Sequence, residues 1–240
     1  MTHTKPFGAP VPDWTPPPRP EMDSLQGRYA TLERLDATRH AADLFDCYAE
    51  DDGIWDYLPV GPFHSAAQFH RWAADAAQLA DPYLLAIRNH ATGRVEGQAS
   101  FLRIAPEGGA IEVGFINYSP ALQRTAAATE AMVLMMAWAF DAGYRRYEWK
   151  CDALNAPSRR AAQRLGFSYE GLFRQATIVK GRNRDTAWFS VIDSEWPALK
   201  EAFEAWLAPS NFDAAGIQKE RLGDLTSLVR ADADPTLSPG

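Results

Sequence analysis

Polar and positively charged residues occur twice at points where the sequence predicts that a strand ends and a helix begins. At the first point, Gln123-Arg124-Thr125 precedes the alanine run Ala126–Ala128. The first backbone N–H groups of a helix have no partner within it and carry partial positive charge, so together with Arg124 they can bind an anion. An alanine-rich helix start can also serve tight packing alone, and this stretch fits both explanations equally well.

The second point follows the strand that is expected to end at Asp152. Asn155 is placed to cap a helix, Pro157 falls in its first turn, and Gly166 lies just past its end. Ser158–Arg160 brings a hydroxyl and two guanidinium groups to this helix start, which suits amide and phosphate groups of a ligand. A well-capped surface helix with solvated arginines is the alternative, but two basic junctions in succession favour a ligand.

The composition describes a globular chain with a local reversal of charge. The 240 residues are 46% hydrophobic and 23% charged, and their net charge is −7. Such a charge disfavours non-specific binding to nucleic acid or to an anionic membrane. Residues 123–180, however, hold nine basic and five acidic residues. We therefore expect no nucleic-acid partner and no membrane partner, and a discrete anion as the ligand of the basic segment.

The cysteines and histidines indicate neither a disulfide framework nor a metal site. Cys47 and Cys151 are far apart, and neither belongs to a Cys-x-x-Cys pair. His64 and His70 are six residues apart and have no carboxylate cluster beside them, unlike ligands on one helix face. No stretch approaches the roughly 18 apolar residues of a membrane span, and the N-terminus lacks a signal-peptide pattern. We expect a cytoplasmic protein without a metal.

The chain alternates between strand and helix patterns, and these elements must position the residues above. Strands are expected at 28–35, 83–88, 95–104, 111–118, 146–152, 169–179 and 186–192, and helices at about 39–50, 65–79, 125–142 and 157–165. This order predicts an α/β (α+β) fold with a mixed sheet and helices on its faces. The charged run 180–185 is expected to be a hairpin turn whose charges are solvated.

The chain is expected to divide into three segments. Residues 1–24 hold seven of the 17 prolines and should form an extended arm, because proline fixes φ and lacks an N–H. Residues 25–208 are expected to form a single domain. Residues 209–240 are expected to form a tail with a short amphipathic helix, which packs on the domain or on a second copy of the chain in a homodimer.

Three motifs resemble the GNAT superfamily of acyl-CoA-dependent N-acyltransferases. Gln123–Ala128 (QRTAAA) resembles the family's Q/R-x-x-G-x-G/A pyrophosphate loop, with Ala126 in place of the usual glycine. Ala128–Ala131 (ATEA) matches the continuation of that loop in the branch that resembles the ribosomal-protein N-terminal acetyltransferases RimJ and RimL. Asn155–Phe167 resembles the N-x-x-S-x-R-x-x-x-K-x-G-F helix that lies along the cofactor, and Ile111–Phe115 (IEVGF) resembles the E-x-G strand.

The resemblance implies an enzyme that transfers an acyl group, above all acetyl, from CoA to a primary amine by direct attack on the thioester. It also implies a mostly antiparallel sheet that is splayed between the strands at 111–118 and 146–152, where the pantetheine arm binds. The residues that it implies for acetyl-CoA binding are Phe115, Ile116, Asn117, Gln123, Arg124, Thr125, Ala126, Ala127, Ala128, Thr129, Asn155, Ser158, Arg160 and Arg164.

The same resemblance suggests two catalytic residues. Glu112 lies on the strand that would hold the thioester, so it is the candidate base that takes the amine's proton, directly or through a water. The alternative is a strand carboxylate that pairs with Arg or Lys on a neighbouring strand. Many family members place a proton-donating Tyr where this chain has Ala162. Ser158 is therefore the candidate donor to the thiolate, with helix capping as its alternative, and Tyr169 is a further candidate.

The loop 53–63 is expected to select the acceptor, a protein N-terminus or a small-molecule amine. Trp55, Tyr57 and Phe63 can wall a pocket, and Asp56 together with Glu112 can attract a cationic amine. Packing of the aromatic rings beneath the loop is the alternative. Two other functions stay open: transfer of succinyl or another acyl group, and a CoA-binding sensor or assembly module without catalysis.

Overall fold

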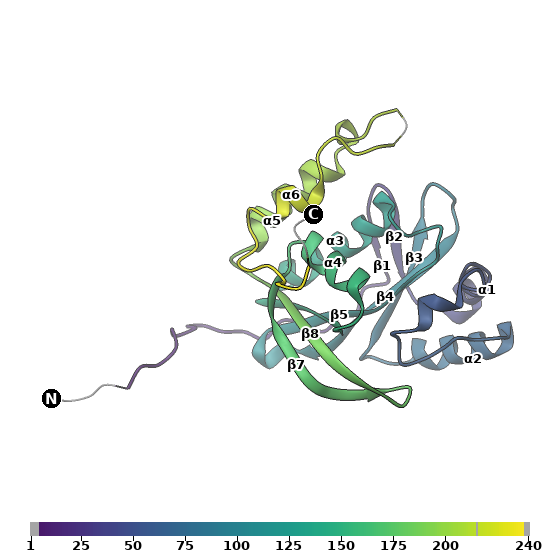
Figure 1. The fold of residues 1–240 in the computed structure, drawn as a ribbon, viewed down its shortest axis with the longest axis horizontal. Coiled ribbons are helices and arrows are strands. Elements are labelled where there is room, and N and C mark those ends of the chain that lie inside the picture. Colours follow the sequence, from purple (N-terminus) through teal and green to yellow (C-terminus); the bar gives the residue numbers. More distant parts are fainter. Residues whose placement is uncertain (1–4, 215, 238–240) are drawn as a thin grey trace.

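A computed structural model describes residues 5–214 and 216–237 of the chain. Their strands form one eight-stranded sheet in the order β1-β2-β3-β4-β5-β6-β8-β7 (Figure 1). The strands are β1 (Ser24–Gln26), β2 (Ala30–Arg34), β3 (Tyr83–Asn89), β4 (Val95–Ala105), β5 (Ala110–Tyr118), β6 (Arg146–Asp152), β7 (Ser168–Val179) and β8 (Arg182–Ile192). The helices are α1 (Ala37–Tyr48), α2 (Ala66–Ala77), α3 (Ala126–Asp141), α4 (Ala156–Arg164), α5 (Trp196–Leu207) and α6 (Leu222–Thr226), with short 3-10 turns η1 (Asp52–Trp55), η2 (Pro106–Gly108) and η3 (Pro209–Asn211).

Neighbouring strands run antiparallel except where β5 meets β6. The parallel pairing joins Ala110–Val113 to Arg146–Trp149 and then stops, although both strands continue. The later part of β5 therefore has no strand beside it on the β6 side. This arrangement confirms the predicted fold class, a mostly antiparallel mixed sheet that is splayed between these two strands.

Helices cover both faces of the sheet, and each face has its own core. Helices α3, α4 and α5 pack on the larger core, in which α3 buries Met135 and Met136 completely. Helices α1 and α2 lie together on the other face, where Leu44 and Phe69 belong to the smaller core (Figure 1). Helix α3 is apolar nearly all round because it lies between the sheet and α5. The start of this buried helix is thereby fixed relative to β5.

Three elements differ from the sequence prediction. Strand β1 adds an edge strand next to the proline-rich arm, and α5 forms over residues that were not predicted to be helical. The signal for α5 was present, because its buried residues Trp196, Leu199, Phe203 and Trp206 follow helical spacing. The turn between β7 and β8 is also shorter than the expected run 180–185. Two residues with positive φ, Lys180 at 48° and Gly181 at 74°, form it, as in hairpin turns that match the strand twist.

The two ends of the chain contact the domain through specific groups. In the N-terminal arm, Trp14 Nε1 donates to Glu107 O at 3.0 Å, and Tyr144 Oη donates to Pro18 O at 3.0 Å. Near the C-terminus, Leu222 of α6 is fully buried against the larger core. The predicted tail thus packs on its own chain here, while residues 1–4, 215 and 238–240 of the predicted arms lie outside the described residues. No helix in the described ranges has the length and apolarity to cross a membrane.

Candidate active site

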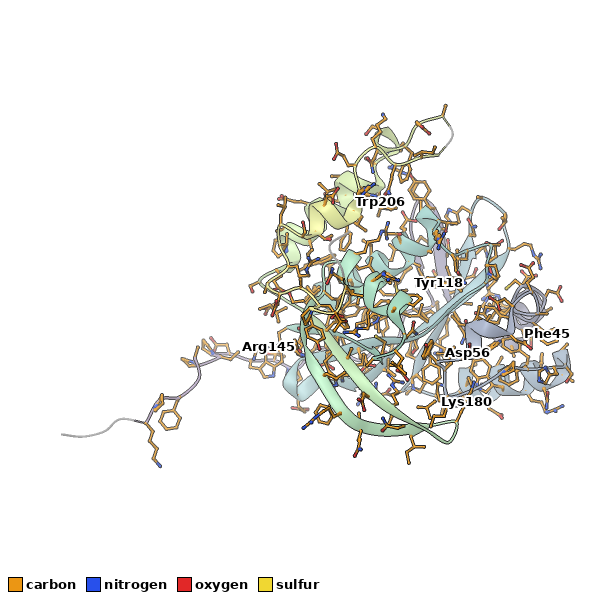
Figure 2. The ribbon with its side chains drawn as sticks, viewed as in Figure 1. Phe45, Asp56, Tyr118, Arg145, Lys180 and Trp206 are labelled. Atoms are coloured by element: carbon orange, nitrogen blue, oxygen red, sulfur yellow. The ribbon has the colours of Figure 1, made fainter. Side chains whose placement is uncertain are left out.

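A cavity of about 1530 Å³ opens where β5 and β6 diverge. Its wall includes the starts of α3 and α4, and Tyr118 and Trp206, which Figure 2 labels, also lie along it. The residues predicted from the sequence that line it are Tyr57, Glu112, Phe115, Ile116, Asn117, Gln123, Arg124, Thr125, Ala126, Ala128, Thr129, Asn155, Ser158, Arg160 and Arg164. Ala127 is not among the lining residues, because its side chain is buried in the core below the helix start.

A bulge in β5 shapes the strand edge that faces this cavity. Gly114 pairs with Ser100 of β4, but Asn117 is the next β5 residue that pairs in register, with Gln98, so β5 carries one extra residue there. Phe115 takes a positive φ of 49°, which is rare for a residue with a side chain and is typical of strained positions in bulges. The bulge interrupts the ladder with β4 at Phe115 and Ile116, which both line the cavity.

The start of α3 presents amide groups and one free guanidinium. Thr125 caps the helix, and its Oγ1 accepts a hydrogen bond from Ala128 N at 3.1 Å. Within the described residues no hydrogen bond reaches the amides of Ala126 and Ala127. Arg124 has a positive φ of 62° and an exposed side chain, and no described group pairs with it. This helix start can therefore hold an anion without losing an existing contact.

The start of α4 has the cap that the sequence predicts. Asn155 Oδ1 accepts a hydrogen bond from Ser158 N at 3.1 Å. Ser158 Oγ in turn accepts one from Trp149 Nε1 at 3.0 Å. Because the indole N–H can only donate, the serine hydroxyl keeps its own proton for another acceptor. Ser158 is thus held by two contacts, and its O–H is not used by Trp149 but lies beside the Cys151 thiol, whose pKa burial raises and this hydroxyl lowers.

The arginines of α4 have three different surroundings. Arg160 is exposed, lines the cavity and has no partner among the described residues. Arg159 does not line it, because its guanidinium makes two hydrogen bonds of 2.7 Å to the buried carboxylate of Asp234. Arg164 Nη1 donates to Thr129 Oγ1 at 3.1 Å and so joins α4 to α3. Of the three, Arg160 is the one whose guanidinium has no hydrogen-bond or ion-pair partner in the described part of the chain.

Glu112 lies at the base of the cavity between two cations. Its side chain is 3% exposed, its Oε1 lies 2.5 Å from Arg103 Nη1, and its Oε2 lies 3.0 Å from Lys150 Nζ. Burial raises the pKa of the Glu112 carboxyl above its usual 4.5, although Lys150 and Arg103 oppose the rise. The ion pairs that the sequence analysis gave as an alternative are thus present, and the carboxylate still belongs to the cavity wall.

The loop predicted to select the acceptor divides into core and cavity residues. Tyr57 lines the cavity, and its Oη donates to Leu154 O at 3.2 Å. Trp55 and Phe63 pack in the smaller core against each other, with ring centres 5.3 Å apart. Asp56 is exposed and does not line the cavity. The acidic groups that could attract a cationic amine therefore do not include Asp56.

Several residues around the cavity were not predicted from the sequence. Lys150 and Glu148 alternate with apolar residues along β6, and Lys150 Nζ lies 2.7 Å from Glu148 Oε2. This alternation was the signal that could have identified their shared face. Glu130 of the ATEA motif accepts hydrogen bonds from the backbone of Arg28, Tyr29 and Ala30, so it holds β2 against α3.

Within the described ranges, no group of three or more His, Cys, Asp or Glu side chains could hold a metal ion.

Comparisons with known proteins agree with this geometry. The model of the acetyltransferase (GNAT) domain family matches residues 30–168. A GCN5-related N-acetyltransferase from Brucella melitensis has a crystal structure that is 48% identical, with a TM-score of 0.88 over 90% of this chain and 100% of that chain. A probable GNAT acetyltransferase from Chromobacterium violaceum is 40% identical, with a TM-score of 0.76 over 82% of this chain and 100% of that chain. An uncharacterized N-acetyltransferase, p20, from Bacillus licheniformis is 27% identical over 73% of this chain and 99% of its own length.

Proposed function

Because the chain belongs to the acetyltransferase (GNAT) family and is an acyl-CoA-dependent acetyltransferase, we propose that it transfers acetyl from acetyl-CoA to a primary amine by direct attack on the thioester. One observation carries this proposal. The open edge of β5 lies in the same cavity as two helix starts whose arginines, Arg124 and Arg160, have no partner within the described residues. A ligand with both phosphates and an extended amide chain suits that combination.

In this proposal the donor lies along the cavity with its phosphates at the helix starts. The amides of Ala126 and Ala127 and the guanidinium of Arg124 hold the pyrophosphate, and Arg160 supplies a second charge-assisted contact. The pantetheine arm runs in the gap between β5 and β6. Its amide groups hydrogen-bond to the free edge of β5 around Phe115–Asn117, as an added strand would.

The same edge of β5 supplies the donors for the reaction. When the amine attacks the thioester carbonyl, a C–N bond forms and negative charge develops on the carbonyl oxygen. Backbone N–H groups at the bulge around Phe115 stabilise that charge, because they are fixed by the sheet before the substrate arrives. The C–S bond then breaks, and the Ser158 hydroxyl, whose proton is not used by Trp149, donates a hydrogen bond to the leaving thiolate. The thiolate takes its proton from water, and the proton that Glu112 took from the amine returns to water.

Glu112 accepts the amine's proton, directly or through a water. Burial raises the pKa of its carboxyl, which makes the carboxylate a stronger base than an exposed one. Arg103 makes room for the amine, because its side chain is 61% exposed and can move away from Oε1 of Glu112. Lys150 stays in place, because it also pairs with Glu148. The pocket near Tyr57 then receives the acceptor, a small-molecule amine or a protein N-terminus.

The proposal is tested by incubating the protein with acetyl-CoA and a panel of amines, peptides and polyamines while following the release of free thiol. We expect thiol release that depends on one class of amine. Donor binding without thiol release from any of them would contradict the proposed acceptor chemistry. Parallel reactions with succinyl-CoA determine whether the acyl group is acetyl or longer.

The substitution Glu112→Gln tests the base. General base catalysis contributes about 100-fold to 10,000-fold, so we expect turnover with a saturating amine to fall within that range while acetyl-CoA affinity is kept. Since the carboxylate must be ionised, kcat/KM of the native enzyme should rise with pH through a pKa above 4.5, and the variant should lose that rise. Glu148→Gln is the matched control, because Glu148 pairs in register with Glu112 on β6 and contacts Lys150 but does not line the cavity. Unchanged turnover in Glu112→Gln would exclude Glu112 as the base.

A further inference from the structure

Arg184 of β8 is a cavity residue without a partner. It lines the cavity and is half-buried, and its Nε is fully enclosed without a hydrogen-bond acceptor in the described residues. No described group forms a hydrogen bond or an ion pair with the rest of its side chain. The adjacent Asp185 does not neutralise it, because that carboxylate accepts from Gln175 N at 2.8 Å and from Asn183 Nδ2 at 3.0 Å. A partly dehydrated guanidinium without an acid is costly unless a ligand supplies one.

The register of the sheet places Arg184 on the same face as the proposed base. Trp188 of β8 pairs with Lys150 of β6, and Lys150 Nζ lies 3.0 Å from Glu112 Oε2. Thr186 pairs with Asp152, the last residue of β6. Alternate residues of a strand face the same side, so Arg184 continues the row of Trp188 and Thr186 past the end of β6. Glu112 and Arg184 therefore lie on one face of the sheet and line the same cavity. Glu112 is level with Glu148 and Ser190, and Arg184 is six residues further along β8, so about 20 Å of strand separates the two positions.

Two further observations concern the surroundings of Arg184. Burial raises the pKa of the Cys151 thiol to about 11, and a hydrogen bond from Ser158 and the nearby charge of Arg184 oppose that rise. The hairpin that carries Arg184 is also tied to the acceptor loop, because Lys180 Nζ donates to Trp55 O at 2.8 Å. Figure 2 shows Lys180 next to Asp56 at this end of the molecule. The β7–β8 hairpin and the loop at 51–59 thus enclose the acceptor end between them.

The other cations at this end of the cavity already have acids. Arg103 lies 2.5 Å from Glu112, and Lys150 lies within 3.0 Å of both Glu112 and Glu148. Arg184 is therefore the cation at this end that has no acid partner in the described residues, and Asp51 and Asp152, which also line the cavity, form no ion pair with it. A guanidinium offers a planar fork of donors that matches a carboxylate in two parallel hydrogen bonds.

We propose that Arg184 binds a carboxylate of the acceptor, so that the amine acylated by this enzyme carries an acid group. The inference rests on the proposed function and names the substrate class of the same site. Glu112 meets the amine while Arg184 meets the carboxylate, and the acceptor is held at both ends. The carboxylate can belong to a free acid whose amine lies at the far end of a long chain, or to an acidic side chain near the amino terminus of a peptide, and both offer Arg184 the same pair of oxygens.

Matched pairs of acceptors test the proposal. Long-chain ω-amino acids are compared with their carboxamides, and peptide amides with Asp or Glu within the first few residues are compared with their Asn or Gln counterparts. We expect the native enzyme to prefer the acid over its neutral partner in at least one of these two comparisons. The comparison that shows the preference identifies the source of the carboxylate. In Arg184→Gln, KM for the acid should rise about 10-fold to 100-fold, the range expected for a lost hydrogen bond to a charged group, while KM for the neutral partner stays unchanged.

Two further variants separate this role from a structural one. Arg184→Lys keeps the positive charge but not the planar set of guanidinium donors. It should therefore keep part of the preference for the acid that Arg184→Gln loses. Arg182→Gln is the matched control, because Arg182 lies on the same strand, is exposed and does not line the cavity. An equal loss for acid and neutral acceptors in Arg184→Gln, or no preference in the native enzyme, would overturn the proposal. A loss of CoA affinity in Arg184→Gln would also overturn it, because Arg184 would then belong to the donor site.

Calorimetry keeps this inference distinct from the proposed function. Acid and neutral acceptors are titrated into the native protein and into Arg184→Gln, each saturated with CoA. If no amine releases thiol but the native complex binds the acid and the variant does not, the acceptor chemistry fails while the carboxylate site stands. If amines react and the acid binds no better than its neutral partner, the proposed function stands and the carboxylate site fails.

Discussion

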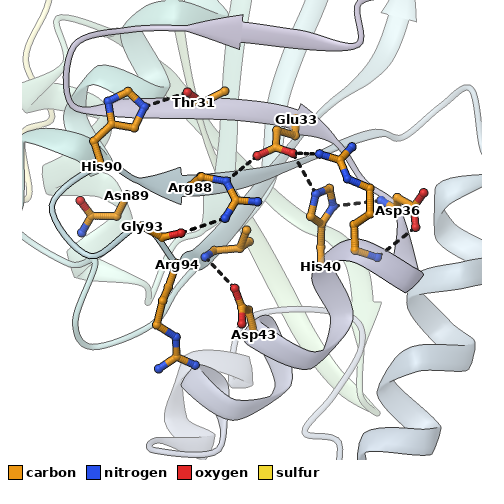
Figure 3. Close-up of polar contacts among 12 residues, drawn as sticks. Thr31, Glu33, Asp36, His40, Asp43, Arg88, Asn89, His90, Gly93 and Arg94 are labelled. Carbon is orange, nitrogen blue, oxygen red and sulfur yellow. Dashed lines mark hydrogen bonds and ion pairs between the residues drawn. The ribbon is translucent and has the colours of Figure 1, made fainter.

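The arginines of two regions of this protein have opposite surroundings. Around Glu33 of β2 (Figure 3), the carboxylate accepts from Arg88 Nε at 2.7 Å, from Arg39 and, at 3.2 Å, from His40 Nε2. At the cavity, Arg124 and Arg160 meet no acid in the described part of the chain. The first region satisfies its charges internally and needs no ligand. The second leaves them free at two helix starts, and that difference marks where an anion can bind.

Consecutive residues of α4 repeat this difference within one turn of helix. Arg159 is 8% exposed and is bound by both carboxylate oxygens of Asp234, which is 2% exposed. Arg160 points to the cavity and is exposed. Each residue of a helix is rotated by about 100° from the one before it, so neighbours on the chain reach different environments. The net excess of basic residues in this segment therefore overstates the charge that is available to a ligand.

Breaking the ion pair between Arg159 and Asp234 should have the largest effect on stability. Arg159→Ala leaves the Asp234 carboxylate buried without a partner, and removing one member of a buried ion pair costs about 3 to 5 kcal/mol. We expect a loss of about 3 kcal/mol, the low end of that range, because the segment at 231–237 can move away and expose Asp234 to water. Urea unfolding measures the loss, and limited proteolysis of the C-terminal segment detects its release. If Arg159→Ala unfolds at the native urea midpoint and its C-terminal segment still resists protease, the ion pair does not stabilise the protein in this way.

The neighbouring arginine should give the opposite result. Arg160→Ala and Arg124→Ala remove charges that have no partner among the residues that the structure describes, so each should leave stability within about 0.5 kcal/mol of the native value. Each should weaken CoA by about 1.5 to 3 kcal/mol, the range for a hydrogen bond to a charged group. Calorimetric titration with CoA measures this, with Arg182→Ala as the control from outside the cavity. Native CoA affinity in both variants would show that the phosphates lie elsewhere.

The helix starts of this site could be predicted from the sequence because their signals are local. Asn155 caps α4 as expected, and Thr125, near which the first helix was expected to begin, caps α3, since a cap is a contact between residues three positions apart. The order of strands and helices follows from periodicity in the same way. The missed helix α5 also had such a signal, in the spacing of its buried residues.

The partners of the charged residues could not be predicted, because they come from distant parts of the chain. Arg159 and Asp234 are separated by 75 positions, and no local pattern at either residue indicates the other. Arg184 was expected in a solvated turn, yet the turn takes just Lys180 and Gly181, so β8 carries Arg184 to the cavity. Trp55 and Phe63 were expected to line a pocket or fill the core, and tertiary packing alone places them in the core.

The closed cluster around Glu33 should make stability depend on pH. Burial lowers the pKa of His40 below its usual 6.5, although Glu33 opposes this. Burial alone would raise the pKa of Glu33, but hydrogen bonds from Arg88 and His40 bring it below its usual 4.5. As pH falls below 6.5 the unfolded chain takes up a proton that folded His40 does not, and below 4.5 the same holds for Glu33. Stability should therefore fall on acidification in both windows.

The slope of this loss can reach at most about 1.4 kcal/mol per pH unit for each proton taken up. In His40→Gln we expect a smaller slope between about pH 6.5 and 5 than in the native protein, because the variant has no ring to protonate in the unfolded state. Below about pH 4.5 the two proteins should lose stability together, since Glu33 is present in both. Urea unfolding at successive pH values measures both slopes. An identical slope in the upper window would mean that His40 takes up its proton equally well in the folded protein, and the cluster would then be open to solvent like the arginines of the cavity.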